Sequence, residues 1–329
     1  MSLVGFDPGS GAYVDTRVAR GFPLGGIGAG GFGFNTDGSF GELRITNNWM
    51  HPLPAPRGCF HALFTRASGV SRTVMLRRLP ERGEYDGIAN VRSTEFRGLL
   101  PAFTLRYHDE LPLDVRLDGF TPHVPHDVRD STLPAAVFRF TLANPGGAAV
   151  EAAVLFAFEN VLGRGGSGHL GLVLGAEHEV QGIVPRVTYD SVTGNFQEPV
   201  ALGARRGVRF RTAQRYDARS HRRSVTGEYL LLAEAAPGVV LTVCDGWNAD
   251  ETRPALLADF GRDGRIASRA SGRRGEDGAY RPAAAVAAGV TVPPGAAREV
   301  VFTLAWWTAD HVTDPDLGHT PAGAPRGTR

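Results

Sequence analysis

The sequence of 329 residues contains no lysine, so all 35 of its basic residues are arginine. A phosphate-binding loop of the Walker type needs a lysine that reaches the terminal phosphates, and the absence of lysine therefore excludes that class of nucleotide site. The 34 acidic residues leave a net charge of +1. A net charge this small creates no electrostatic field that would attract nucleic acid or an anionic membrane, and we expect neither as a partner.

Cysteine is nearly absent as well. The two cysteines, Cys59 and Cys244, lie far apart in apolar stretches and outside any C-x-x-C pair. This favours buried free thiols in a reducing compartment over a disulfide framework. The sequence has no apolar run long enough to span a membrane, and its start lacks the basic and apolar regions of a signal peptide. We therefore expect a cytoplasmic protein without an integral membrane segment.

Common hydrolase motifs, such as G-x-S-x-G and H-E-x-x-H, are missing, and one motif that is present lies in the wrong context. Gly26, Gly28 and Gly31 satisfy the G-x-G-x-x-G spacing of dinucleotide sites. Such a site needs a buried strand before the glycines and a helix after them. Here Pro23 interrupts the preceding stretch, and residues 32–45 alternate with period two around a turn at 35–38. The pattern predicts a glycine-rich bend that leads into a β-hairpin, and we expect no cofactor.

Short alternating runs dominate the rest of the chain. In the predicted strand at 113–120, for example, Leu113, Val115 and Leu117 alternate with charged side chains, as in a half-buried strand. Further strands are predicted at 60–66, 73–78, 103–107, 136–142, 150–158, 170–174, 208–211, 229–233, 239–244, 284–292 and 298–306. We interpret 136–158, with its turn at 144–147, as a hairpin. The last pair of strands, joined at 293–295, is interpreted as a closing hairpin.

One segment is predicted to be helical, with Thr252 as its cap, Pro254 in its first turn and Gly261 as its end. The overall pattern predicts an all-β fold. We expect a large antiparallel β-sandwich of the supersandwich type, with long loop insertions and at most one or two short helices. The predicted organisation is an N-terminal arm at 1–17, the sandwich at 18–307 and a disordered polar tail at 308–329.

The densest cluster of polar residues is His123-Val-Pro-His-Asp-Val-Arg-Asp130. Its imidazoles and carboxylates could ligate a metal ion or exchange protons, but all of them share one irregular segment, and we expect no metal there. Two interpretations stay open. Asp127 and Asp130 could tie down the loop by accepting backbone N–H bonds. Alternatively, His126, Asp127 and Asp130 form a rim that contacts a ligand or another domain.

A second cluster follows the first predicted hairpin. Glu42, Asn47, Asn48 and Trp49 combine a carboxylate, two amides and an aromatic face, which is the set of groups that binds a sugar. The alternative is a capped loop whose Trp49 side chain packs on the core. These four residues are candidates for contact with a substrate or with another domain.

Several of these segments together resemble the N-terminal domain of glycoside hydrolase family 116, which includes bacterial β-glucosidases and non-lysosomal glucosylceramidases. The blocks that carry the resemblance are GFPLGGIGAG at 21–30, DGSFGELR at 37–44, NNW at 47–49, FTPHVPHD at 120–127, DSTLP at 130–134, VFRF at 137–140, YLLLA at 229–233 and VVFTLAW at 300–306. The resemblance extends from about residue 18 to residue 307. One departure is Leu43, at a position where we expect tryptophan.

The resemblance implies a sandwich that docks onto an (α/α)6 toroid of several hundred residues. In that toroid a glutamate nucleophile and an aspartate acid/base hydrolyse a β-glucoside with retention. No position of this sequence matches those residues, so we expect a non-catalytic scaffold for a toroidal domain in cis or in trans, or one that self-associates. Such a domain should expose an apolar patch on the order of a few hundred Å².

Two other functions stay open. A free-standing carbohydrate-binding protein would hold a β-glucoside between the loops at 47–49 and 126–130, in a groove lined by Trp49. A small glycosidase would pair Asp127 with Glu42 or Glu159. A flat apolar face would favour the scaffold over the carbohydrate-binding protein, and the glycosidase requires two carboxylates that converge across a cleft.

Overall fold

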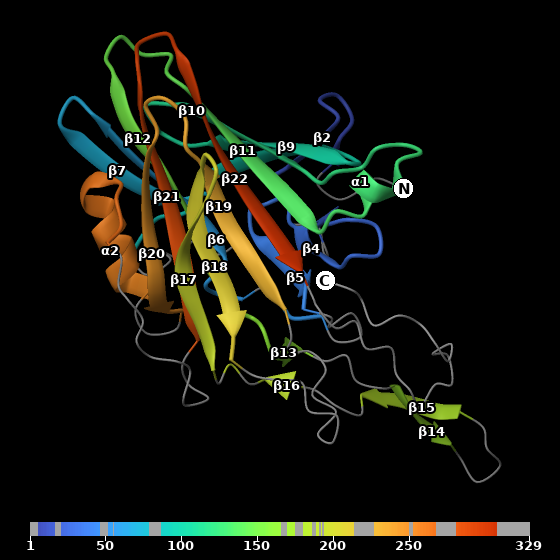
Figure 1. Ribbon diagram of the computed structural model, residues 1–329. Coiled ribbons are helices and arrows are strands. Elements are labelled where there is room, and N and C mark those ends of the chain that lie inside the picture. Colours follow the sequence, from blue (N-terminus) through green and yellow to red (C-terminus); the bar gives the residue numbers. More distant parts are fainter. Residues whose placement is uncertain are drawn as a thin grey trace.

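The computed structural model describes residues 6–16, 21–46, 52–54, 56–78, 87–165, 170–174, 180–185, 189–190, 192, 194–213, 227–249, 253–267 and 281–307. Over these residues the chain is mostly β-structure, with two large antiparallel sheets packed face to face (Figure 1). The fold is the all-β antiparallel sandwich that the alternating pattern predicts. Among the described residues, no helix is both long and apolar enough to cross a membrane.

The larger sheet has ten strands. In spatial order they are β1 (Phe6–Asp7), β2 (Ala12–Val14), β8 (Ser93–Leu99), β9 (Ala102–His108), β10 (Asp114–Phe120), β11 (Ala135–Ala143), β22 (Ala297–Trp307), β19 (Glu228–Glu234), β18 (Arg205–Thr212) and β17 (Asn195–Leu202). β1 and β2 lie in the segment expected to be an arm, and they extend one edge of this sheet.

The smaller sheet has five strands. In spatial order they are β20 (Val240–Asn248), β21 (Pro282–Val292), β12 (Val150–Glu159), β6 (Phe60–Ala67) and β7 (Val70–Met75). Both faces of β12 are buried, since one face meets the larger sheet and the other meets helix α2 (Arg253–Asp263). This explains why β12 reads as a nearly continuous apolar run.

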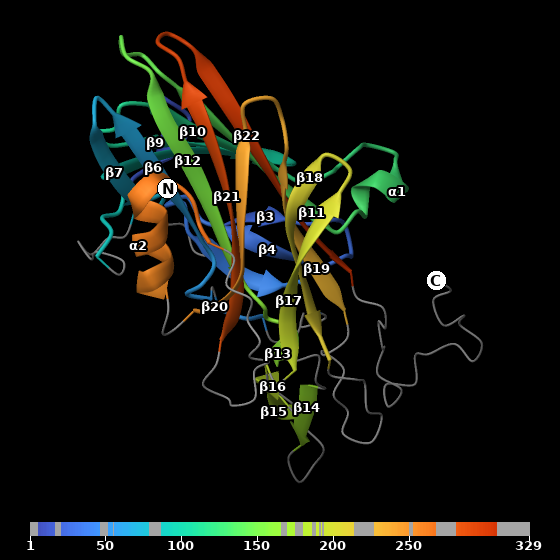
Figure 2. The same ribbon diagram turned by 60° about the vertical axis from the view of Figure 1, so that its left-hand side comes forward.

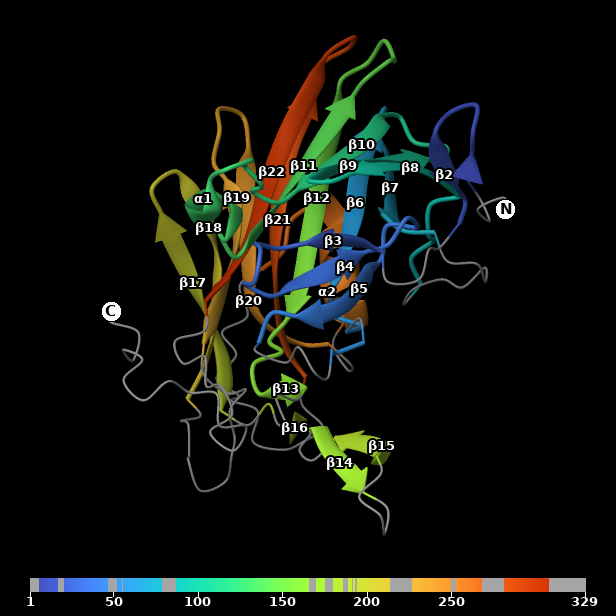
Figure 3. The same cartoon turned by 90° about the vertical axis from the view of Figure 1, so that its right-hand side faces the viewer.

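A third sheet of three strands crosses the sandwich (Figure 3). It consists of β3 (Phe22–Leu24), β4 (Gly31–Phe34) and β5 (Phe40–Arg44). The turn between β4 and β5 lies at residues 35–38, where the sequence pattern predicts it. The remaining described strands form two short two-stranded sheets. In one, β13 (Arg164–Gly165) pairs with β16 (Tyr189–Asp190), and in the other, β14 (Leu170–Leu174) pairs with β15 (Val180–Pro185).

Aromatic rings join the three sheets in one core. The Phe156 ring of β12 lies 5.2 Å from that of Phe138 on β11 and 5.7 Å from that of Phe302 on β22. From the three-stranded sheet, Phe40 contacts Phe156 at 5.6 Å and Phe34 stacks on Phe103 at 5.1 Å. Edge-to-face and stacked pairs of this kind add packing energy to the hydrophobic burial.

Helix α2 covers the outer face of the smaller sheet (Figure 2). Its Leu256, Leu257 and Phe260 side chains are buried against that sheet, whose outward-facing positions on β12 and β21 are mostly alanine. The prediction that Gly261 ends the helix is wrong, because α2 continues to Asp263 and closes with a bond from the Gly264 amide to Phe260 O (2.8 Å). The predicted cap Thr252 lies outside the described residues.

The prediction that residues 136–158 and the last two strands each form a hairpin is wrong. β11 and β12 belong to different sheets, and so do β21 and β22, so both connections cross between the layers. Asn144 holds the two crossings together. Its side-chain amide donates to Val292 O at 3.0 Å and to Ala148 O at 2.8 Å, and its backbone amide donates to Ala296 O at 2.9 Å. Pro293 and Pro294 have no amide to donate to a continuing ladder, which favours the crossing.

His61 on β6 points into the aromatic core. It is 1% exposed, and its ring centroid lies 4.3 Å from that of Phe156 and 5.2 Å from that of Phe140. Among the described residues, neither ring nitrogen of His61 has a hydrogen-bond partner. Burial lowers the pKa of His61 from 6.5 to about 3, because the charged form would lose its hydration.

This burial makes the stability of the protein depend on pH. Below pH 6.5 the unfolded chain takes up a proton at His61, whereas the folded chain stays neutral there down to about pH 3. We expect the wild type to lose about 2 kcal/mol more unfolding free energy between pH 7 and pH 5 than His61→Phe does. Urea unfolding at both pH values measures this difference. The control is His123→Gln, which changes an exposed histidine. If the unfolding free energies of wild type and His61→Phe fall by the same amount between pH 7 and pH 5, His61 is not the cause of the pH dependence.

Candidate functional site

The glycine-rich bend lies between β3 and β4, where three stretches of backbone meet. A Cβ atom added at Gly26 would lie 2.5 Å from Leu133 O, and one at Gly30 would lie 2.3 Å from Arg44 O. Both distances are too short for any side chain. The glycines are therefore required by close packing against the end of β5 and the loop before β11. No helix follows the bend, in agreement with the exclusion of a dinucleotide site.

Hydrogen bonds hold this junction together. The Ile27 amide donates to Ser131 O at 2.8 Å, and the Trp306 ring N–H donates to Ala29 O at 2.7 Å. The Thr121 hydroxyl accepts from the Gly25 amide at 3.3 Å and donates to Ala135 O at 2.9 Å. The bend, the segment from Thr121 to Ala135 and the end of β22 thus form one connected unit.

The 123–130 cluster forms a short helix and its cap. Asp127 is the N-cap of α1 (Val128–Ser131), and its side chain accepts a bond from the Asp130 amide at 3.0 Å. The Ser131 hydroxyl accepts from the Val124 amide and donates to Val124 O, both at 2.9 Å. Asp127 therefore ties down the loop, which was one of the two interpretations. His126 and Asp130 are exposed, on the rim of this loop.

Only part of the second cluster lies in the described residues. Glu42 on β5 is partly exposed and forms an ion pair with Arg44 at 2.9 Å. Asn47, Asn48 and Trp49 lie outside the described residues. Leu43, at the position where the resemblance suggests tryptophan, is fully buried, and its backbone pairs with Leu53. The Leu43 side chain therefore belongs to the core.

Glu159, the third candidate carboxylate, is buried at the end of β12. One of its side-chain oxygens accepts from the Gly58 amide at 2.6 Å, and the other pairs with Arg164 at 3.1 Å. The Tyr229 hydroxyl donates to the Glu159 carbonyl and accepts from the Val161 amide. Burial raises the pKa of Tyr229 well above its ordinary value. These contacts make Glu159 the centre of a closed polar network inside the sandwich.

Exposed apolar side chains gather around the junction of the glycine bend and α1. They are Ile27, Val124, Val128, Leu133 and Trp307, which we call the α1 patch. Trp307 faces outward and is 59% exposed, whereas its neighbour Trp306 is buried. The sequence alone does not predict the patch, because the exposure of the other four side chains depends on how the loops pack.

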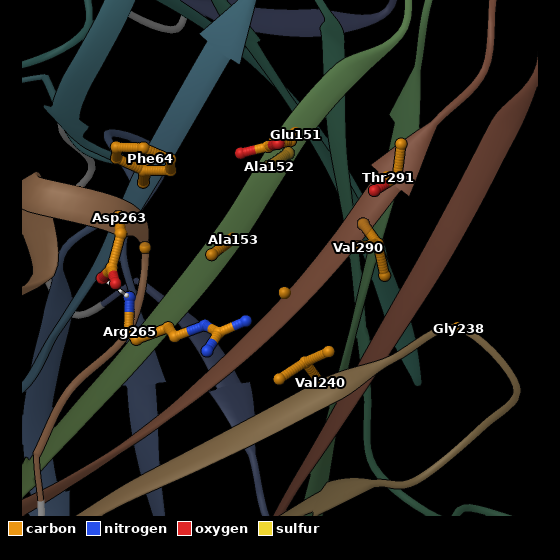
Figure 4. A pocket seen from close by; sticks show the side chains of 12 residues that line it. Phe64, Glu151, Ala152, Ala153, Gly238, Val240, Asp263, Arg265, Val290 and Thr291 are labelled. Carbon is orange, nitrogen blue, oxygen red and sulfur yellow. Dashed lines mark hydrogen bonds between the residues drawn. The ribbon is translucent and has the colours of Figure 1, made fainter.

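A hollow of about 210 Å³ lies on the outer face of the smaller sheet, beside the end of α2 (Figure 4). Its floor includes Ala153 and Gly289, and the Arg265 side chain extends across it. Glu151 on its edge pairs with Arg66 at 3.2 Å, and the Arg265 amide bonds to Asp263 at 3.0 Å. None of these residues forms a recognisable motif in the sequence. The hollow marks the area of this face that α2 leaves uncovered.

The family assignment follows from a comparison with family models. Residues 21–313 match the model described as "beta-glucosidase 2, glycosyl-hydrolase family 116 N-term". The chain belongs to this family. The match spans the glycine bend, α1 and β22, so all three parts of the junction lie within the family 116 domain. A comparison with curated proteins gave no match.

Solved structures give a weaker likeness. A chain assigned as a kojibiose phosphorylase from the human microbiome shares 6% identity, with 90% of this chain and 32% of that chain covered and a TM-score of 0.36. A polysaccharide lyase shares 8% identity, with 89% and 32% covered and a TM-score of 0.33. An aldose 1-epimerase homologue from Escherichia coli K12 shares 8%, with 87% and 99% covered and a TM-score of 0.33. The chain spans about a third of the first two chains. These scores carry no argument about the site.

Two glycines of the bend provide a matched test of the junction. Gly28 and Gly30 both have positive φ, at +71° and +77°, but an added Cβ would meet nothing within 4 Å at Gly28. We expect Gly28→Ala to lower the unfolding free energy by about 1 kcal/mol, which is the backbone cost alone. Gly30→Ala should cost about 3 kcal/mol or more, because the Arg44 carbonyl must move. Urea unfolding measures both, and equal losses would show that close packing does not require Gly30.

Proposed function

We propose that this family 116 domain is a non-catalytic β-sandwich, on which the toroidal (α/α)6 domain of a β-glucosidase or glucosylceramidase docks in cis or in trans. The description of the family model as an N-terminal region supports this proposal. The observation that carries it is that the candidate carboxylates are committed to structural contacts. Glu42 pairs with Arg44, Asp127 caps α1, and Glu159 bonds to Gly58 and Arg164.

Retaining hydrolysis makes different demands on carboxylates. It needs two of them about 5 Å apart across a cleft, one to attack the sugar and one to transfer protons. Glu159 is 4% exposed, and each of its side-chain oxygens has a partner, so it faces no cleft that could hold a sugar. Asp127 would have to leave the α1 cap to act as a base. These commitments favour a scaffold over a small glycosidase.

Both cysteines support placement of the domain in a reducing compartment, and we propose the cytoplasm. Cys59 and Cys244 are buried free thiols. Burial, and then the nearby Glu159 charge, raise the pKa of the Cys59 thiol well above its ordinary value. A protonated, buried thiol is chemically inert, as suits a structural position.

The proposed function is tested by activity and binding measurements on the purified chain. We expect no hydrolysis of an aryl β-glucoside above the buffer rate, because Glu42, Asp127 and Glu159 hold structural contacts. Isothermal titration with glucose and cellobiose should give no saturable heat.

The contrary results are distinct. Turnover that is lost in Asp127→Asn or Glu42→Gln, with melting temperature unchanged, would show that this domain is itself a glycosidase. Saturable binding of cellobiose without turnover would show a carbohydrate-binding protein instead.

A further inference from the structure

We propose that the α1 patch is the surface on which the catalytic domain sits. This assignment rests on the proposed function and adds the location of the interface. The patch comprises Ile27 from the glycine bend, Val124, Val128 and Leu133 from the segment between β10 and β11, and Trp307 from the end of β22.

The composition of the patch is unusual for a solvent-exposed surface. Eleven large apolar residues of the described chain are exposed, and five of them belong to this patch. Val128 is 75% exposed and Ile27 and Trp307 are each 59% exposed. Single exposed apolar residues are normal on proteins, whereas a group of them marks a contact surface. Tryptophan is also enriched among the residues that contribute most to binding.

The antiparallel register connects the two sides of the patch. Ala135 of β11 pairs with Ala305 of β22, and the Trp306 amide donates to Pro134 O at 2.9 Å. The Ala135 amide also bonds to Leu133 O at 2.8 Å, so the chain turns at Pro134 and leaves the ladder there. Leu133 and Trp307 each adjoin one partner of the Trp306–Pro134 bond, which places both residues at the same end of the β11–β22 pair.

The patch is also held rigidly. The Asp127 cap and the Ser131 hydroxyl fix the loop that carries Val124 and Val128. The bond from the Ile27 amide to Ser131 O fixes the bend against this loop. A surface that is ordered before binding loses little conformational entropy when a partner covers it. The close packing of the glycine bend therefore serves to build a preformed contact face.

The course of the chain identifies the occupant. Trp307 is the last residue of β22, and the family match, which is described as N-terminal, ends six residues later at 313. Six residues span at most about 20 Å. The part of a family 116 enzyme that follows this domain therefore begins within about 20 Å of the patch. We assign the patch to that following domain rather than to a second copy of this chain.

The chain offers matched control positions for a test. Val128, at 75% exposed, is matched by Val70 at 72%, and Leu133, at 45%, is matched by Leu202 at 43%. Val70 lies in β7 and Leu202 in β17, in other parts of the sandwich. The variants Val128→Arg and Leu133→Arg test the patch, and Val70→Arg and Leu202→Arg are the controls. Equal melting temperatures for all four establish that each variant folds.

The probe is the separately produced (α/α)6 domain of a family 116 β-glucosidase, titrated with the full chain. We expect the wild type and both control variants to bind it with Kd values within about threefold of one another. Each patch variant should bind at least about 30-fold more weakly, as expected for the loss of a central apolar contact.

The remaining outcomes separate the two proposals. Binding that the patch variants retain overturns the location of the interface but leaves the scaffold function intact. No binding by the wild type contradicts the scaffold function and the interface with it. If light scattering shows a dimer of the chain that Val128→Arg disrupts and Val70→Arg preserves, the patch belongs to a second copy, and the assignment is wrong.

Discussion

The contact on which the surrounding structure depends is the close approach of backbone to backbone at the glycine-rich bend. Gly26 and Gly30 lie so near the carbonyls of Leu133 and Arg44 that no side chain fits. This approach brings β5, the loop before β11 and the end of β22 together, and the Trp306 ring N–H locks the last of these to the bend. The most distinctive feature of the sequence is therefore a packing requirement, and its product is the surface formed around α1.

The chemistry of the domain follows from where its carboxylates are used. Asp127 stabilises the short helix α1, and Glu159 closes the polar network at the end of β12. Both carboxylates make structural contacts, as does Glu42 in its ion pair with Arg44. An enzyme needs carboxylates that are held in place but free to react with substrate. These commitments support the proposed scaffold function, and the α1 patch is the surface proposed for the partner.

Periodicity predicted most of the strands, because alternation reports directly which face of a strand is buried. It failed at 144–147 and 293–295, where turn residues look the same whether a chain folds back in one sheet or crosses to another. The crossing is decided by distant contacts, such as that of Phe138 with Phe156 and that of Asn144 with Val292. The Asp127 cap was predictable because capping is local. The α1 patch was not, since the exposure of Val124 or Leu133 depends on elements far away in the sequence.

The most direct test of the central claim is hydrogen–deuterium exchange of the chain, alone and in the presence of the separate (α/α)6 domain. We expect amide exchange to slow in peptides covering residues 24–29 and 121–134, which carry the bend and α1, and to stay unchanged at the hollow around Arg265 and Gly289. Protection that falls on the hollow instead, and leaves the bend and α1 unaltered, would contradict the central claim.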